Sequence, residues 1–183
     1  SVLPRFPGIQ AFSWNPLVLG SERAEYESLA KKEGYENFEF TERTVENRLV
    51  RAARRQEYII VSYIDPLEAN KPAFGFDIAS NPTRLKAITK GFNSGKLSAT
   101  DRITLVQETG DQYGILLLLP IYEQGVALKT TEDRHKYRKG FVVEVLRIGD
   151  VVETALKGFS VEGINLILYD LTASIDKHFL YYQ

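Results

Sequence analysis

Runs and alternations of apolar residues along the chain predict a protein rich in β-strands. Residues 58–64 (YIIVSYI) form the strongest apolar run, and the Asp65-Pro66 pair ends it as a turn would end a buried strand. Residues 109–111 (TGD) are a hairpin signal between two further strands. The other segments predicted as strands are residues 38–41, 73–78, 102–108, 113–122, 140–148, 163–171 and 178–182.

Three segments have the apolar spacing and the end signals of helices. The first spans residues 17–32, where one face would carry Leu19, Arg23, Tyr26 and Ala30. The second is predicted from Asn81 as the N-cap and Pro82 as the first helical residue, and it continues to Gly95. The third opens at residues 150–153, which resemble a capping box, and continues to about residue 157.

The order of these elements predicts an α+β fold. Strand pairs joined by short turns favour antiparallel sheet, and the helices are expected to cover one face of it. Residues 6–16 are interpreted as a packed, turn-rich lead-in. Residues 42–56, rich in arginine, are interpreted as a solvated loop or an exposed, ion-paired helical turn, and residues 125–138 as a polar connection.

Length and composition are typical of a globular domain. The 183 residues include 44% apolar and 26% charged side chains, and 23 basic residues are balanced by 24 acidic ones. Without a basic excess, neither nucleic acid nor an anionic membrane surface is an expected partner. No apolar stretch reaches the roughly 20 residues of a membrane span. Because the chain opens with Ser1 and contains no methionine, we expect it to be a processed or excised piece, attached to a membrane only through flanking spans.

Residues that carry catalysis or bind metals are few. Cysteine is absent, which excludes disulfides, thiolate metal sites and cysteine nucleophiles. His135 and His178 lack the spacing of a metal site, and each is interpreted as a surface or turn residue. Residues 91–96 (GFNSGK) lack the spacing of a phosphate-binding loop, so a helix C-cap is the preferred interpretation. We therefore expect a binding domain without cofactors rather than an enzyme, although folding could still bring a nucleophile and a base together.

A different group of residues indicates a binding site. Apolar side chains gather on three predicted strands, and polar side chains stand at the strand ends. The apolar set is Phe74, Phe76, Ile103, Leu105, Leu116 and Leu118, and the polar set is Asp77, Arg84 and Gln107. An apolar concavity with a few oriented polar groups is the usual form of a small-molecule pocket. The alternative is that the apolar residues only form the core beneath the second helix.

Six stretches over about residues 6–156 form a longer pattern. They are FPGIQAFSWNP, SERAEYESLAKKEGYENFEFTER, EYIIVSYIDPLEANKPAFGFDIASNPTR, ITLVQET, GILLLLPIY and KGFVVEVLRIGDVVETAL. Three shorter motifs within these stretches are specific when they occur together: YIDP, GFDIASNPTR and PIY. In this order they resemble the CHASE domain, the extracellular sensor of many bacterial and plant histidine kinases and of nucleotide cyclases.

The resemblance implies an architecture for residues 1–183 as a single sensor domain. The fold would be a long N-terminal stalk helix, cut away before residue 6, followed by two PAS-like subdomains with antiparallel sheets. The boundary between the two sheets would lie near residues 123–138. Residues 37–125 would form the membrane-distal, ligand-binding part, and residues 138–183 with the N-terminal helix would form the membrane-proximal part.

The resemblance also implies a function. The domain would lie outside the cytoplasmic membrane, in the periplasm or the extracellular space, between two membrane spans. It would recognise a small molecule and control a histidine kinase of a two-component system, a diguanylate cyclase or a phosphodiesterase on the same chain. Receptors of this kind usually work as homodimers. The competing interpretation is a ligand-free dimerisation module that transmits a signal across the membrane.

Arg84 and Asp77 stand at informative positions of the resemblance. In the family's best-known branch, which binds cytokinins, an acidic residue in the helix after the Phe-Asp strand binds the purine edge, and Arg84 takes that place here. A guanidinium has only donors, so it suits a carboxylate or a phosphate rather than the purine's N–H groups. Asp77 matches a residue typical of the family and is expected to cap backbone N–H groups of the turn at 79–81.

These residues define the predicted ligand site. Arg84 is expected in the first turn of the second helix, pointing toward an apolar floor. The floor and its polar edge would be Phe74, Phe76, Leu105, Leu116, Leu118 and Gln107. Tyr122 and Phe141 would close the sides, and Gly140 would leave room for a ligand to approach the backbone. The alternative is that Arg84 pairs at the surface with Asp101, an interaction that stabilises proteins little.

Overall fold

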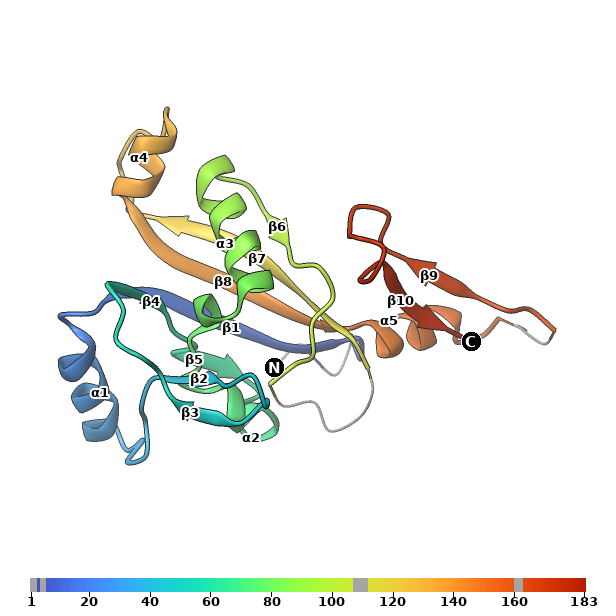
Figure 1. The fold of residues 1–183 in the computed structure, drawn as a ribbon, viewed down its shortest axis with the longest axis horizontal. Coiled ribbons are helices and arrows are strands. Elements are labelled where there is room, and N and C mark those ends of the chain that lie inside the picture. Colours follow the sequence, from blue (N-terminus) through green and yellow to red (C-terminus); the bar gives the residue numbers. More distant parts are fainter. Residues whose placement is uncertain (1–2, 4–5, 107–111, 160–162) are drawn as a thin grey trace.

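A six-stranded antiparallel sheet forms the centre of the computed structural model, which describes residues 3, 6–106, 112–159 and 163–183 (Figure 1). Three long strands make up most of this sheet: β1 (Ile9–Leu19), β7 (Gly114–Tyr122) and β8 (Arg138–Arg147). β8 lies between the other two, because Val143 pairs with Ser13 of β1 and with Leu118 of β7. The described strand pairs are antiparallel, which confirms the predicted antiparallel character of a fold that mixes helices and strands.

Short strands complete the edges of the sheet. β4 (Glu57–Ile59) and β5 (Tyr63–Asp65) pair with successive parts of β1, and β6 (Ser98–Ala99) pairs with β7. Two hairpins lie outside this sheet. They are β2 (Thr41–Arg43) with β3 (Leu49–Arg51), and β9 (Ile167–Tyr169) with β10 (Phe179–Tyr182).

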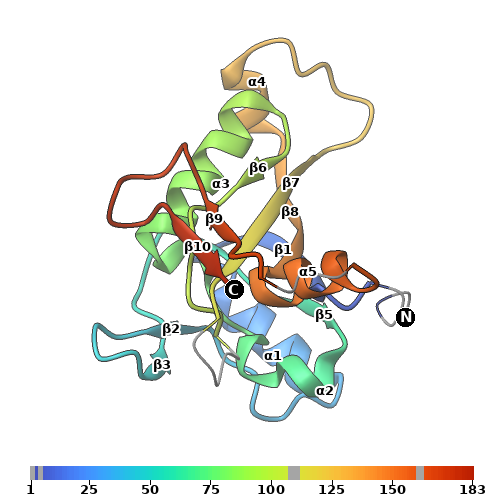
Figure 2. The ribbon, with the colours of Figure 1, turned by 90° about the vertical axis from the view of Figure 1, so that its right-hand side faces the viewer.

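One helix, α3 (Pro82–Ser94), lies across one face of the sheet (Figures 1 and 2). Asn81 caps it, since the Asn81 Oδ1 accepts the backbone N–H of Arg84 at 3.1 Å. Gly95 ends it in the left-handed conformation, at φ 68°. The predicted second helix is therefore confirmed, and residues 91–96 are its C-terminus.

The remaining helices are shorter and lie at the periphery of the sheet. They are α1 (Arg23–Lys32), α2 (Leu67–Asn70), α4 (Thr131–Lys136) and α5 (Ile148–Leu156). In addition, 3₁₀ turns occur at Lys71–Ala73 and Ile78–Ser80.

The main apolar core lies between α3 and the sheet. Ile88 and Phe92 of α3 pack in one cluster with Leu118 of β7 and Phe141 of β8. A smaller cluster lies beside α1 and contains Val18, Ala30, Phe38, Phe40, Ala52, Tyr58 and Ile60. Removal of these side chains from water is the main driving force for this arrangement of elements.

The first strand occupies a segment for which no strand was predicted. β1 covers residues 9–19, and α1 begins only at Arg23, so the start of the helix predicted over residues 17–32 is wrong. Two buried positions of β1 are Ser13 and Asn15, and the Ser13 hydroxyl lies 2.6 Å from the Asn15 Oδ1. Polar residues at inward positions conceal the two-residue alternation that would have indicated a strand.

A single sheet spans the predicted boundary near residues 123–138. β7 and β8 lie on either side of this segment and pair along their length, for example Leu118 with Val143. The segment is therefore a hairpin connection that carries α4, and the predicted division into two sheets at this place is wrong. Neither an N-terminal stalk helix nor a pair of PAS-like subdomains is confirmed. The assignment of residues 37–125 and 138–183 to membrane-distal and membrane-proximal parts stays a prediction.

Other predicted strands also differ from the structure. Residues 58–64 form β4 and β5 rather than one strand, and Val61 between them hydrogen-bonds the backbone of Gly75 and Phe76. Residues 42–56 contain part of the β2–β3 hairpin, not a helical turn. Residues 73–78, and the described part of 102–108, form isolated pairings rather than strands.

The C-terminal predictions are partly confirmed. α5 starts at Ile148, and its N-cap residue makes no side-chain cap, so the capping box predicted at 150–153 is wrong. Asp150 instead lies in the first turn and pairs with Arg147 at 3.2 Å. The closing hairpin is confirmed as β9 and β10, whereas the turn predicted at 109–111 lies outside the described residues.

Candidate functional site

Arg84 lies in the first turn of α3, as predicted, and its side chain turns inward. Only 5% of the residue is exposed. Its guanidinium carbon lies 5.0 Å from the centre of the Phe76 ring, and its Nη2 donates to the Thr104 carbonyl at 3.4 Å. The predicted direction toward Phe76 is therefore confirmed.

The buried guanidinium of Arg84 has no acidic partner among the described residues. Asp101, the predicted surface alternative, pairs with Lys86 at 3.4 Å, so that alternative is wrong. The Arg84 Nε is buried without a hydrogen-bond acceptor. Burial, together with the nearby positive charge of Arg43, lowers the pKa of Arg84 to about 10. The group stays cationic at neutral pH, and its charge is poorly compensated.

An open pocket of about 470 Å³ lies beside this side chain. Three arginines from separate segments line it: Arg43 of β2, Arg84 of α3 and Arg102. None of the described lining residues is acidic, and hydroxyl side chains such as Ser80 and Thr104 and the amides of Asn47 and Asn81 contribute to the wall. The Arg43 Nε, like that of Arg84, is buried without an acceptor. We call these residues the Arg84 pocket.

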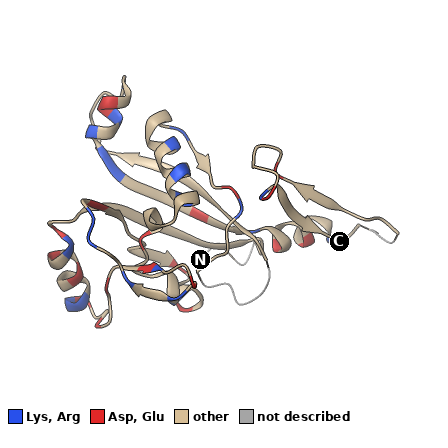
Figure 3. Cartoon of the chain, in the orientation of Figure 1, with Lys and Arg blue, Asp and Glu red and all other residues tan. Residues whose placement is uncertain are grey.

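The start of α3 adds to the positive character of the Arg84 pocket. Asn81, Pro82 and Thr83 line it, so the N-terminal end of the helix dipole lies at its edge. α3 contains no acidic residue, and Figure 3 shows lysine and arginine along it. A small anion is the ligand class that this electrostatic environment favours.

The predicted apolar floor is close-packed. Phe76, Leu105 and Leu116 surround a cavity of only about 30 Å³ next to Arg84, with room for about one water. Leu118 is fully buried in the core beneath α3. These residues form the inner wall behind Arg84, and the space for a ligand lies on the outer side of this arginine.

Three predicted aromatic residues lie away from the Arg84 pocket. Tyr122 and Phe141 contact Phe92 in the C-terminal half of α3, with ring centres 6.3 and 4.3 Å from it, so they do not close the sides as expected. Phe74 lines a separate hollow of about 190 Å³ with Tyr26, Tyr35 and Phe38, among others.

Of two further predicted residues, Gly140 and Gln107, the structure describes only Gly140. A Cβ on Gly140 would lie 2.3 Å from the Asn15 carbonyl oxygen, so β1 fills the space that was expected to admit a ligand. Gln107 lies outside the described residues. The ligand-binding role of the remaining predicted residues stays a prediction.

Asp77 has the structural role that the sequence predicted. It is fully buried, and its Oδ1 accepts the backbone N–H groups of Ala79 and Ile59, both at 3.1 Å. Arg55 lies 3.4 Å from the other carboxylate oxygen. Burial raises the pKa of Asp77 to about 6, against the lowering effects of these hydrogen bonds and of Arg55.

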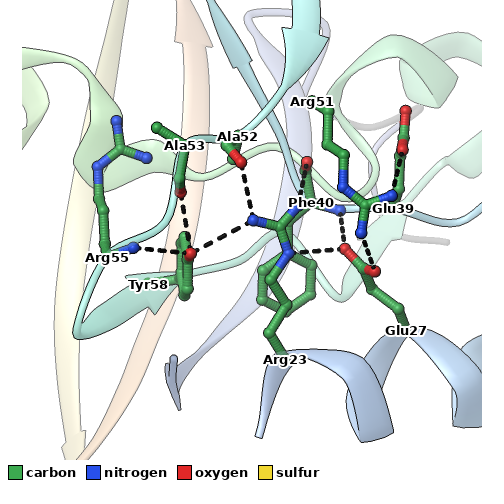
Figure 4. A network of polar contacts seen from close by, with 9 residues as sticks. All are labelled: Arg23, Glu27, Glu39, Phe40, Arg51, Ala52, Ala53, Arg55 and Tyr58. Carbon is green, nitrogen blue, oxygen red and sulfur yellow. Dashed lines mark hydrogen bonds and ion pairs between the residues drawn. The ribbon is translucent and has the colours of Figure 1, made fainter. Parts of the chain in front are cut away.

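A second arginine cluster, near α1, shows how the protein pairs a buried guanidinium (Figure 4). Arg23 donates to Glu27 at 2.9 Å and to the carbonyls of Ala52 and Phe40. Arg51 pairs with the other Glu27 oxygen at 2.8 Å. Although burial alone would raise the pKa of Glu27, the Phe40 N–H and the two arginines lower it. In this cluster the cations have carboxylate partners, unlike Arg84.

Sequence reasoning missed Arg43 and Arg102 as pocket residues. Arg43 lies in the arginine-rich segment 42–56, which was interpreted as solvated, and Arg102 directly precedes the ITLVQET stretch. Neither has a local signal that separates it from other surface arginines. Only the approach of β2, α3 and residues 102–104 brings them together.

The described residues contain no group of three or more His, Cys, Asp or Glu side chains that could hold a metal ion. His135, one of the two histidines, contacts the Asn93 side chain near the end of α3 at 2.6 Å. Within the described residues, none of the helices is both long enough and apolar enough to cross a bilayer.

Comparison with protein families gives a match over nearly the whole chain. The model of the CHASE domain matches residues 2–181. A search of curated proteins found no match. CHASE domains are extracellular sensor domains and not catalytic ones. The resemblance seen over residues 6–156 is thereby confirmed, and the chain belongs to the CHASE domain family.

Proposed function

We propose that this sensor domain binds a small anionic molecule in the Arg84 pocket. It would act as the extracytoplasmic part of a transmembrane receptor whose output is a histidine kinase, a diguanylate cyclase or a phosphodiesterase. The observation that carries the proposal is the buried guanidinium of Arg84, which lacks a carboxylate partner among the described residues.

The energetic reason is the cost of burying an unpaired charge. Removing a cation from water costs several kcal/mol unless a partner compensates it. The Phe76 ring and the Thr104 carbonyl compensate Arg84 only in part, since both are neutral. A carboxylate or phosphate in the pocket would supply the missing negative charge and accept from the planar guanidinium.

Signalling requires that the ligand prefer one arrangement of the domain over another. A ligand with equal affinity for two arrangements shifts nothing, however tightly it binds. The Arg84 pocket suits this requirement because its wall combines β2, α3 and residues 102–104. A ligand that contacts all three would bias their relative positions.

The competing candidate is a module that signals through dimerisation without a ligand. The observation in its favour is the exposure of apolar side chains in the C-terminal part, for example Leu171 at 91% and Ile175 at 87%. Exposed apolar residues that gather on one part of a surface often mark a contact with another protein. A homodimer and a ligand-binding sensor are compatible, so the two candidates differ only in whether a small molecule is needed.

Thermal-shift screening with small carboxylates and phosphates tests the proposal. A true ligand raises the melting temperature in proportion to the logarithm of its concentration once sites are filled, whereas a pure dimer responds to protein concentration. The Arg84→Ala variant should weaken binding of the best anion by about 1.5–3 kcal/mol, the scale of a charged hydrogen bond.

Lys86→Ala is the matched control for this test. Lys86 lies on the same helix but pairs with Asp101 and does not line the Arg84 pocket. Its loss should leave the affinity unchanged. If no anion binds, or if the affinity of a bound anion is the same in Arg84→Ala and the unaltered protein, the site assignment is wrong.

A further inference from the structure

Arg102 belongs both to the Arg84 pocket and to the attachment of the C-terminal hairpin. It lines the pocket together with Arg43 and Arg84. Its guanidinium, however, donates to two carbonyls beyond the pocket: Nη1 to Phe179 at 2.6 Å and Nη2 to Asp176 at 2.8 Å. One side chain therefore connects the candidate ligand site to the β9–β10 hairpin.

The position of Arg102 is fixed by an aromatic ring. Its guanidinium carbon lies 4.1 Å from the centre of the Tyr113 ring, and this ring also contacts Phe179 of β10 at 6.4 Å. A guanidinium that lies over a ring can turn in its plane, because the ring contact does not direct individual N–H groups. The ring contact thus keeps the Arg102 guanidinium at the edge of the Arg84 pocket, while the acceptors of its hydrogen bonds can change.

Among the described residues, one side-chain hydrogen bond joins the hairpin directly to α3. The Lys177 Nζ lies 3.4 Å from the Thr83 hydroxyl, at the outer limit of a hydrogen bond. A hollow of about 190 Å³ separates Lys86 of α3 from Asp170 and Thr172 at the hairpin. A two-stranded sheet is only marginally stable by itself, so it depends on contacts with the rest of the domain. The two Arg102 hydrogen bonds are among these contacts, beside the ring contact of Phe179 with Tyr113 and the burial of Leu180.

An anion in the pocket would compete with these carbonyls for Arg102. Hydrogen bonds from a guanidinium to an anionic oxygen are about twice as strong as those between neutral groups, and a carboxylate or phosphate accepts two of them side by side. The carbonyls of Asp176 and Phe179 are neutral acceptors at an exposed position, and the nearby Asp176 carboxylate, which is exposed to solvent, attracts Arg102 without a direct ion pair. The anion is therefore the better acceptor.

We propose that Arg102 is the third anion-binding residue of the Arg84 pocket and that an anion withdraws it from Asp176 and Phe179. Ligand binding then loosens the β9–β10 hairpin. The inference rests on the proposed function and deepens it, because it assigns the segment that responds to the ligand. Arg84 compensates the ligand's charge, and Arg102 couples its presence to the C-terminal part.

Hydrogen–deuterium exchange with inorganic phosphate and with succinate as probes tests the coupling. Amides of the hairpin, such as those of Leu166, Asp170 and Gln183, which donate to backbone carbonyls, report its opening. In the unaltered protein, a saturating probe should speed their exchange roughly tenfold. In Arg102→Gln, exchange should be fast without a probe and should not respond to one, and affinity for the probe should fall roughly tenfold.

Arg134→Gln is the matched control. Arg134 also donates to backbone carbonyls, those of Asn93 and Leu128, but it does not line the Arg84 pocket or contact the hairpin. Its loss should leave both exchange of the hairpin and probe binding unchanged. Arg84→Ala separates the two proposals, because it should move the probe response to roughly 10- to 150-fold higher probe concentration while leaving the hairpin protected without a probe.

The outcomes are distinct. If neither probe binds the unaltered protein, the proposed function fails for these ligand classes, and the inference fails with it. If a probe binds but hairpin exchange does not change, the proposed function stands and the coupling through Arg102 is wrong. Unchanged hairpin exchange in Arg102→Gln would also overturn the coupling.

Discussion

The guanidinium of Arg84 lies 5.0 Å from the ring centre of Phe76, and no described carboxylate pairs with it. Cation–π contact of this kind contributes about 2 kcal/mol when both groups are desolvated, which is less than the cost of burying the charge. Arg84 is thus a residue that the folded protein holds at an energetic disadvantage. We therefore expect Arg84 to serve ligand binding in the pocket that it lines, because it does not stabilise the core behind it.

Replacement of Arg84 by methionine should stabilise the domain. Methionine fills a similar volume against Phe76 without a buried charge. Apolar replacement of even paired buried charges is often neutral or stabilising by about 1–4 kcal/mol, and the charge of Arg84 has no carboxylate partner among the described residues. Urea denaturation should show a higher midpoint with an unchanged slope. The same variant should lose anion binding. A lower midpoint would mean that the charge of Arg84 is compensated in the free protein.

Arg23→Met is the counterpart of that experiment. Arg23 is nearly as buried as Arg84, but it pairs with Glu27 and donates to two carbonyls. Its removal leaves Glu27 buried with fewer partners, so stability should fall by about 3 kcal/mol. The free energy of unfolding is thus expected to rise in Arg84→Met and to fall in Arg23→Met, and this comparison does not depend on any ligand.

Glu27→Gln should destabilise the domain by about 3 kcal/mol at neutral pH. The carboxylate joins Arg23, Arg51 and the Phe40 N–H, and its pKa is lowered. A lowered pKa in the folded state gives stability that is present at neutral pH and lost as the pH falls through that pKa. Denaturation curves should therefore converge for the variant and the unaltered protein at acid pH. Glu25→Gln, at an exposed position of the same helix, should change little at any pH.

Asp77 should give the opposite dependence on pH. Its pKa is raised from 3.8 in the unfolded chain to about 6 in the folded protein. The folded state thus binds the proton more tightly than the unfolded state. The stability that protonated Asp77 gives to the fold is therefore fully present below about pH 4 and is lost as the pH rises through about 6.

Asp77→Asn is the variant that isolates this contribution. The amide oxygen can still accept from Ile59 and Ala79, which both bond to a single carboxylate oxygen. Relative to this variant, the unaltered protein should lose about 3 kcal/mol of stability between about pH 3 and 7, since each pKa unit corresponds to about 1.4 kcal/mol. Denaturation midpoints at several pH values measure it, and parallel curves for the two proteins would refute the raised pKa.

Gly140→Ala should destabilise the central sheet. The added Cβ would lie 2.3 Å from the Asn15 carbonyl oxygen, and the φ of Gly140, at 147°, is unfavourable for other residues. A loss of about 2–4 kcal/mol is expected from the combined strain. Gly125→Ala is the control, because Gly125 also has a positive φ but has open space around it. A similar small loss in both variants would show that β1 and β8 can move apart.

Parts of the fold could be predicted from the sequence because their signals are local. The start and end of α3 depend on Asn81, Pro82 and Gly95, whose effects reach only a few residues. β7 has a long apolar run and β8 has a long alternation of apolar and polar residues, and both patterns are typical of strands. β1 escaped prediction because Ser13 and Asn15 occupy two of its buried positions, where a hydrogen bond joins the two side chains.

The sequence by itself determined that Arg84 begins a helix, that cysteine chemistry is excluded, and that the chain resembles the CHASE domain. Only the tertiary structure decided which arginines are paired. Arg43 and Arg51 come from one arginine-rich segment, yet Arg51 meets Glu27 and Arg43 lines the Arg84 pocket. The physical reason is that an ion pair depends on a few ångströms in space, which residues far apart in the sequence reach only through the packing of strands and helices.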